Sequence, residues 1–115
     1  MIPYAKHYID EDDILAVSDV LKNGFLTQGP TIGKFERAIA HYVGAKYAVA
    51  VSSGTAALHL AAIAAGAGPD KSLITSPITF VASANAGLYV GAKVLLADVG
   101  MDTINMSPNA LKASL

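Results

Sequence analysis

The sequence predicts an α/β fold in which helices pack around a mainly parallel sheet. Between Tyr47 and Leu115, short apolar runs alternate with longer segments of helical character, which is the order of elements in parallel sheets. The short runs are apolar along their whole length, as expected for strands that are covered on both faces. Polar residues follow each run, at the edge of the sheet where α/β proteins bind ligands.

The first 45 residues predict two amphipathic helices joined by an irregular loop. The first helix follows Asp10, where a cluster of acidic residues suits the positive end of a helix dipole, and it stops at Asn23-Gly24. The loop occupies residues 24–30. The second helix is expected to begin at about Thr31 and to end with Gly44 as its cap.

Strands and helices are expected to alternate in the rest of the chain. In order, these elements are the strand Tyr47–Val51, the helix Gly54–Ala65, the strand Leu73–Thr75, the helix Phe80–Val90, the strand Val94–Ala97 and a helix from Ser107-Pro108 onward. The last helix opens with a serine N-cap and a proline in the first helical position. The first of these helices is apolar nearly all round, which predicts burial on most of its sides.

The composition is too apolar for a self-contained small domain. Hydrophobic residues make up 53% of the 115 residues and charged residues 15%, whereas charged residues usually make up about 25%. A small domain has a large surface for its volume and should be more polar than average. We therefore expect this chain to be the inner part of something larger, either truncated or closed off by partner subunits.

Charge and segment patterns exclude several classes of function. The net charge is −1 and no basic cluster occurs, which argues against a nucleic-acid partner. The N-terminus lacks the basic and apolar regions of a secretory signal. Asn85 and Lys93 interrupt the longest apolar stretch, which argues against a membrane span. Without cysteine, disulfides and cysteine-based metal sites are excluded. We expect a soluble, cytoplasmic protein.

The first expected strand end carries the most informative polar residues. There the chain leads through Ser52 and Ser53 into Gly54-Thr55 and an alanine-rich helix. A helix N-terminus offers unpaired N–H donors to an anion, and the hydroxyls of Ser53 and Thr55 could add further donors. Ordinary N-capping explains the same residues equally well. The P-loop, the dinucleotide fingerprint and the nucleophile elbow are all absent, which favours a small phosphorylated cofactor.

The remaining candidates are less specific. Phe80, at the start of the second apolar helix, could cover a planar ligand or pack in the core. Asp98 could orient a group in the site or act as a cap. His59 is expected to be a packed, hydrogen-bonded core residue. His7 and His41 lack the spacing of metal ligands, and we expect no metal site.

Three segments together resemble one known family. They are residues 25–30 (FLTQGP), 48–58 (AVAVSSGTAAL) and 74–85 (ITSPITFVASAN). In this order and at this spacing they resemble the nucleotide-sugar aminotransferases of the DegT/StrS type. Members of that family are fold type I enzymes that depend on pyridoxal 5'-phosphate (PLP). The similarity extends from Met1 to about Ala113, which is effectively the whole chain.

The resemblance implies a fold and a cofactor. The chain would be the N-terminal portion of the large PLP-binding domain, which is incomplete here. Residues 1–45 would form N-terminal helices and a substrate or interface loop, and residues 46–115 the start of the α/β sheet region. The PLP phosphate would be held by backbone amides and the threonine hydroxyl of Gly54, Thr55 and Ala56. Phe80 would stack on the pyridine ring.

The resemblance also implies substrates and a partner. The full-length enzyme would transfer an amino group, with glutamate as the expected donor, to a UDP-linked 4-keto-6-deoxy sugar. Its product would serve a surface or flagellar glycan, and the similarity is strongest to members on the pseudaminic acid pathway. Two subunits of a homodimer would share each active site. The substrate side would be lined by Tyr4, Gly24, Phe25, Leu26, Thr27 and Gly54.

No catalytic residue is expected within these 115 residues. In the family, the lysine that forms the Schiff base with PLP and the acidic residue that holds the pyridinium proton both lie beyond the point equivalent to Leu115. None of the seven lysines here matches the family's lysine motif. Two alternatives remain open: a non-catalytic remnant that binds a phosphorylated ligand or oligomerises, and a PLP-dependent sugar dehydratase of the same family.

Overall fold

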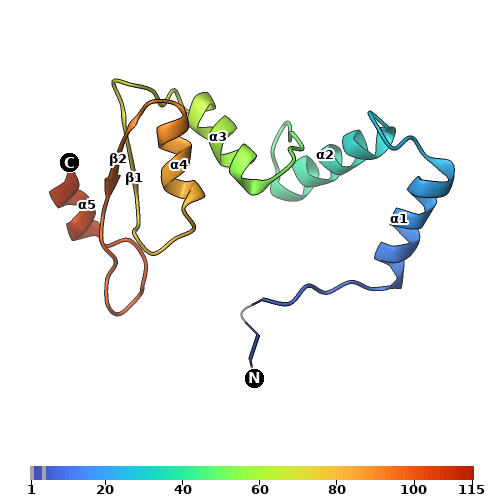
Figure 1. Ribbon diagram of the computed structural model, residues 1–115, viewed down its shortest axis with the longest axis horizontal. Coiled ribbons are helices and arrows are strands. Elements are labelled where there is room, and N and C mark those ends of the chain that lie inside the picture. Colours follow the sequence, from blue (N-terminus) through green and yellow to red (C-terminus); the bar gives the residue numbers. More distant parts are fainter. Residues whose placement is uncertain (1, 4) are drawn as a thin grey trace. The chain divides into compact units, whose positions relative to one another are not determined.

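A computed structural model describes residues 2, 3 and 5–115, and its elements fall into two units, Met1–Ala50 and Val51–Leu115. Figure 1 shows the elements that the described residues form, namely α1 (Glu11–Asn23), α2 (Pro30–Val43), α3 (Gly54–Ala64), β1 (Ser72–Thr75), α4 (Ala82–Tyr89), β2 (Lys93–Leu96) and α5 (Pro108–Ser114). The alternation of helices and strands from α3 onward confirms the predicted α/β class.

The two helices of the first unit begin and end where their local sequence dictates. Asp10 caps α1, because its carboxylate accepts hydrogen bonds from the N–H groups of Asp12 and Asp13, both at 3.1 Å. The Asp13 carboxylate accepts in return from the Asp10 N–H at 3.2 Å, which completes a capping box. α2 starts at Pro30, one residue before the predicted start. It ends at Gly44, whose left-handed backbone (φ 68°) suits glycine.

The second unit is built on a two-stranded parallel sheet. β1 pairs with β2 so that Ser72 lies opposite Lys93 and Thr75 opposite Leu96. α4 connects the two strands and packs on both of them, and α3 packs on α4. The chain then leaves β2 through a loop that closes where the Ser107 N–H donates to the Asp98 carbonyl at 2.8 Å. Ser107 caps α5 as predicted.

Small residues allow α4 to lie very close to the sheet. Gly87 is buried, and a Cβ atom added there would come within 2.9 Å of Val94 Cγ2 and 3.0 Å of Leu73 Cβ. These distances are shorter than carbon atoms tolerate without displacement. The buried apolar side chains among the described residues are all alanines: Ala40, Ala62, Ala82, Ala86, Ala92 and Ala97. The core is therefore made of close backbone approaches instead of large interlocking side chains.

The predicted strand Tyr47–Val51 is wrong as an element of this structure. Its residues form no ladder, and among the described residues the sheet contains β1 and β2 only. A strand needs a neighbour to exchange backbone hydrogen bonds, and this apolar run has none here. The Ala50 N–H instead donates to a carboxylate oxygen of Glu36 at 2.8 Å.

Burial is also lower than the sequence predicts. α3 was expected to be buried on most sides, yet Ala62 is its only buried residue, and Leu60 and Ile63 are about half exposed at 48% and 53%. The strands are mostly half-buried, although we expected both of their faces to be covered. The physical reason is that α4 covers one side of the sheet and one face of α3, while within residues 2, 3 and 5–115 no other element packs extensively on them.

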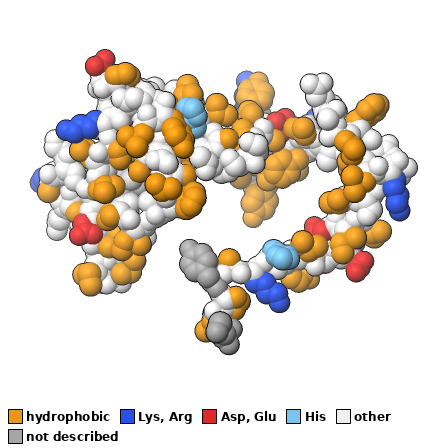
Figure 2. All heavy atoms as spheres, viewed as in Figure 1, with side chains coloured by type: hydrophobic (Ala, Val, Ile, Leu, Met, Phe, Trp, Pro, Cys, Tyr) orange, Lys and Arg blue, Asp and Glu red, His pale blue; other side chains and the backbone are white. Residues whose placement is uncertain are grey.

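Large apolar side chains are exposed in both units, as the low content of charged residues predicts. Figure 2 shows hydrophobic side chains spread over the visible surface of each unit. In the first unit, α1 has no buried residue, and Leu15, Val17 and Leu21 are each more than 60% exposed. As to a lipid bilayer, none of the helices in the described part of the chain has the length and apolar character needed to span one.

The close approach at Gly87 generates a prediction. Gly87→Ala should lower the free energy of unfolding by about 1–2 kcal/mol, because overpacking outweighs the gain in helix propensity. Gly33→Ala is the matched control, since its Cβ would meet only the flexible end of Arg37 at 3.3 Å. That control should stabilise α2 by about 0.5–1 kcal/mol. Chemical denaturation measures both changes, and equal effects at the two positions would contradict the packing described above.

Candidate functional site

The candidate site lies at the carboxyl edge of the parallel sheet. Because β1 and β2 are parallel and in register, Thr75 and Leu96 end at the same edge, and the loop to α4 leaves from there. α3 ends at the opposite edge, next to the start of β1, so its N-terminus is directed toward the carboxyl edge. Figure 1 shows α3 and α4 running in the same general direction. Ligands of α/β proteins collect at this edge.

The N-terminus of α3 presents two unpaired backbone donors. Ser53 is the N-cap: its hydroxyl accepts a hydrogen bond from the Ala56 N–H at 3.2 Å, and its carbonyl accepts from the Ala57 N–H at 3.1 Å. Within the described residues, the N–H groups of Gly54 and Thr55 have no hydrogen-bond partner. These are the first two positions of the helix, where no intrahelical acceptor exists. Both expected roles, capping and anion binding, therefore fit here, on different amides.

Phe80 stands at the N-terminal side of α4 with its side chain 74% exposed. The loop before it is held by local bonds: the Ile78 N–H donates to the Ser76 hydroxyl at 3.2 Å, and the hydroxyls of Thr79 and Ser83 lie 3.1 Å apart. The Phe80 carbonyl accepts from the Ser83 N–H at 3.0 Å. The structure thus anchors the backbone of Phe80 and leaves its ring exposed, as it leaves many other large apolar side chains, so a role in covering a ligand stays a prediction.

The other candidates take local roles. His59 is half-buried and its ring lies 5.2 Å from the ring of Tyr89, so it packs as predicted, but its side chain makes no hydrogen bond with the described residues. One Asp98 carboxylate oxygen accepts from the N–H of the next residue, Val99, at 2.8 Å, which is a local contact that decides neither of its two expected roles. His7 and His41 are exposed, and the described residues form no cluster of metal ligands.

The residues expected on the substrate side lie mostly in the first unit. Gly24 caps the C-terminus of α1 through its N–H, which donates to the Val20 carbonyl at 2.9 Å. Phe25 and Leu26 follow with exposed side chains. Tyr4 lies outside the described residues. Gly54 belongs to the second unit, so a shared site for Gly54 and the loop 24–27 stays a prediction.

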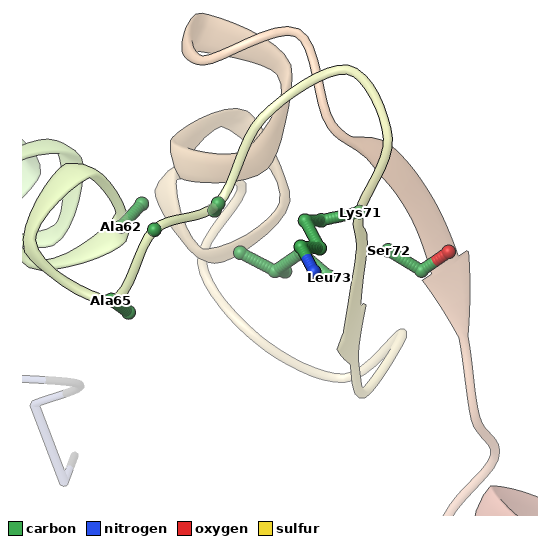
Figure 3. A pocket seen from close by; sticks show the side chains of 7 residues that line it. Ala62, Ala65, Lys71, Ser72 and Leu73 are labelled. Atoms are coloured by element: carbon green, nitrogen blue, oxygen red, sulfur yellow. The ribbon is translucent and has the colours of Figure 1, made fainter.

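The second unit also has a cavity of about 370 Å³. It is lined by Ala62 and Ala65 at the end of α3 and by Lys71, Ser72 and Leu73 at the start of β1. Figure 3 shows these side chains around the opening. This is the amino edge of the sheet, opposite the free amides of α3. The cavity contains none of the predicted cofactor residues.

Glu36 is a residue that the sequence analysis missed. Its carboxylate accepts the Ala50 N–H at 2.8 Å, which ties α2 to the segment that precedes α3. The two residues are 14 positions apart, and no motif or periodicity relates them. A glutamate on a surface helix is ordinarily a solvated residue, so the sequence contained no signal for this contact.

Fold and site together define a class: an α/β protein that offers a helix N-terminus and an aromatic ring at the carboxyl edge of a parallel sheet. The sequence profile of the DegT/DnrJ/EryC1/StrS aminotransferase family matches residues 7–115. The chain therefore belongs to this family, which confirms the resemblance seen in the three motifs.

Curated relatives are similar along the whole chain. The spore coat polysaccharide biosynthesis protein SpsC of Bacillus subtilis is 43% identical over 114 residues, covering 99% of this chain and 29% of the relative. A UDP-4-amino-4,6-dideoxy-N-acetyl-β-L-altrosamine transaminase of Campylobacter jejuni is 43% identical over 115 residues, covering all of this chain and 30% of the relative. The chain thus spans less than a third of the length of these proteins.

Solved structures show the same fold. Spr1654 from Streptococcus pneumoniae, known in PLP and PMP forms, matches with a TM-score of 0.88 and 32% identity over 99% of this chain and 29% of its own. The sugar aminotransferase CalS13 from Micromonospora echinospora matches with a TM-score of 0.81 and 35% identity over 100% of this chain and 31% of its own. The fold of this chain is that of the corresponding part of sugar aminotransferases.

The cap of α3 generates the second prediction. Ser53→Ala removes the acceptor of the Ala56 N–H and should lower the free energy of unfolding by about 1 kcal/mol. The neighbouring Ser52 makes no side-chain hydrogen bond within the described residues, so Ser52→Ala should change stability by less than about 0.5 kcal/mol. Thermal or chemical denaturation of the ligand-free protein distinguishes the two. A larger loss for Ser52→Ala would contradict the assignment of the cap.

Proposed function

We propose that this chain is the N-terminal part of the large domain of a PLP-dependent nucleotide-sugar aminotransferase. The observation that carries the proposal is that the amides of Gly54 and Thr55 have no partner among the described residues, at a helix N-terminus directed toward the carboxyl edge of a sheet whose fold is shared with sugar aminotransferases. Membership of the family supports the reaction class. The length of the relatives supports a protein longer than 115 residues, because this chain covers 29–30% of them.

The described residues fit the phosphate end of PLP. Gly54 contributes no side chain, and no described atom outside its own helix and chain neighbours lies within 4 Å of where its Cβ would be, so an anion can approach the backbone there. The free N–H groups of Gly54 and Thr55 and the Thr55 hydroxyl are donors suited to a phosphate. The positive end of the α3 dipole favours its negative charge. The Ala56 N–H, which we also expected to contact the phosphate, already donates to Ser53 and so contributes less.

Each residue has a defined task in the proposed reaction. PLP, when bound, supplies a carbonyl group that takes up the amino group and a ring that accommodates negative charge from the neighbouring carbon. Thr55 and Gly54 fix the phosphate end and thereby the position of the ring. Phe80 covers one face of the ring and excludes water from it. The residues that exchange protons with the substrate are expected outside this chain.

The proposed acceptor is a UDP-linked 4-keto-6-deoxy sugar, with glutamate as the amino donor and a surface or flagellar glycan as the destination of the product. The name of the Campylobacter jejuni relative, a transaminase for a UDP-linked dideoxy amino sugar, supports this acceptor class. The glycan role of SpsC, a spore coat polysaccharide biosynthesis protein, supports the destination. We further propose that Tyr4 and the loop Gly24–Thr27 line the substrate side of the site.

A homodimer with shared active sites completes the proposal. The exposed apolar side chains on α1 support an apolar interface, since such surfaces are rarely left in contact with water. Residues 1–45 would then supply helices and a loop to the interface, and residues 46–115 the start of the sheet region.

The first test uses the protein as its native source produces it. Its intact mass should be several times 11.8 kDa, and the purified protein should carry PLP absorbance that borohydride fixes to a lysine. A mass near 11.8 kDa would contradict the enzyme proposal for this product. A long protein with histidine in place of the lysine would instead indicate the dehydratases of the family.

Substitution of the phosphate donors gives the third prediction. Thr55→Ala should raise the Kd of PLP by about tenfold or more, because hydrogen bonds to charged groups contribute about 1.5–3 kcal/mol. Thr55→Ser keeps the hydroxyl and should stay within about threefold of the unmodified protein. Equilibrium titration of the full-length apoprotein with PLP measures both. Equal affinities for the alanine and serine variants would contradict a hydroxyl contact.

The exposed ring gives the fourth prediction. Phe80→Leu should weaken PLP binding by about three- to tenfold, because stacking contributes about 0.5–1.5 kcal/mol beyond area burial, whereas Phe80→Tyr should retain the affinity. Phe25→Leu is the matched control, since Phe25 is also exposed but belongs to the expected substrate loop. The same titration decides the outcome, and a larger effect at Phe25 would contradict the assignment.

A further inference from the structure

We propose that Glu36 is a positioning residue for the phosphate-binding turn, because its carboxylate holds the backbone of the segment that leads into that turn. Glu36 lies in α2 and is half-buried, and its Oε1 atom accepts a hydrogen bond from the Ala50 N–H at 2.8 Å. Ala50 is four residues before Gly54, the first residue of α3. The inference rests on the function proposed above and adds a residue outside the expected cofactor and substrate contacts.

The contact differs in kind from the other side-chain hydrogen bonds in the described part of the chain. Those bonds join residues no more than four positions apart, within one helix, at a helix end or in a turn. The bond of Glu36 spans 14 positions. It is therefore a tertiary contact and not a consequence of local chain geometry.

The path of the chain explains how the two residues meet. α2 ends at Gly44, whose left-handed backbone reverses the chain, and the Ala45 N–H donates back to the Ala40 carbonyl at 2.9 Å. The chain then returns beside the helix, and a cavity of about 160 Å³ between them is lined from α2 and from residues 46–48. The chain turns at Gly44. Six residues later, the bond between Glu36 and the Ala50 N–H holds the returning chain to α2.

The bond of Glu36 fixes the backbone of Ala50 beside α2. Among the residues that the structure describes, the segment around Ala50 forms no ladder, and this bond is the side-chain hydrogen bond that the segment makes. A carboxylate is a strong acceptor, and its bond to an N–H is charge-assisted. Loss of the bond would allow the segment to shift along α2. The N–H groups of Gly54 and Thr55 would then be held in a less fixed position. Binding of a phosphate that relies on preorganised donors would weaken.

The test compares two ligands in the full-length apoprotein, PLP and pyridoxal, which differ only in the phosphate. Glu36→Ala should lower the affinity for PLP relative to that for pyridoxal by about tenfold, because the substitution disturbs the donors that bind the phosphate. Glu36→Gln retains an acceptor oxygen at the same distance along the side chain and should keep the ratio within about threefold. Glu11→Ala makes the same change at the exposed start of α1 and should leave the ratio unaltered.

A second measurement does not depend on any ligand. Hydrogen exchange of the ligand-free protein should show the Ala50 amide exchanging about tenfold faster in Glu36→Ala, with rates in Glu36→Gln close to those of the unmodified protein. Glu36→Met, which keeps the helix but lacks the acceptor, replaces the alanine variant if that variant does not fold.

The outcomes separate this proposal from the one on which it rests. An unchanged affinity ratio with unchanged exchange at Ala50 would overturn the role of Glu36. Equal losses of PLP and pyridoxal binding would show general destabilisation and would overturn it as well. A full-length protein that binds no PLP would contradict the proposed function, and the exchange measurement would then decide alone whether Glu36 holds the segment.

Discussion

The second unit depends on the close approach of α4 to the parallel sheet. Gly87 has no side chain, and this absence allows the helix backbone to lie against Leu73 and Val94 on the two strands. A helix held at this distance connects two parallel strands in register and starts at their carboxyl edge. The position of Phe80 follows, because the loop before α4 leaves from that edge. The close packing at Gly87 therefore helps to determine the position of Phe80 in the candidate site.

Elements with their own start and stop signals were predictable from the sequence. Asp10 and Ser107 are N-caps in the structure, and Gly44 is a C-cap, each where its residue type favours that conformation. The candidate phosphate site was predictable in the same way, because the donors of a helix N-terminus follow from where the helix begins. Ser53 shows the limit of that reasoning: which amide it would occupy depended on geometry that residue types alone do not specify.

Features that need a distant partner were not predictable. An apolar run such as Tyr47–Val51 gives the same signal whether or not a neighbour is present to complete a ladder, so the strand was predicted and did not form. The burial expected for α3 failed for a related reason, since an all-round apolar helix indicates what could be covered and not what covers it. Glu36 is the converse case. Its bond to Ala50 depends on a chain reversal at Gly44, and neither the glutamate nor the alanine predicts that hydrogen bond by its residue type.

The alanine core has a consequence for how this sequence can vary. At positions such as Ala82, Ala86 and Ala97, truncation to glycine removes a single methyl group, so it leaves almost no cavity. Enlargement is different, because a close-packed backbone contact has no room for another carbon atom. Tolerance at these positions is therefore unequal: truncation to glycine costs about 0.5–1 kcal/mol where the residue lies in a helix, whereas enlargement to valine or leucine meets the close-packed backbone. Two proteins of this fold could differ widely on their surfaces and still agree at these small residues.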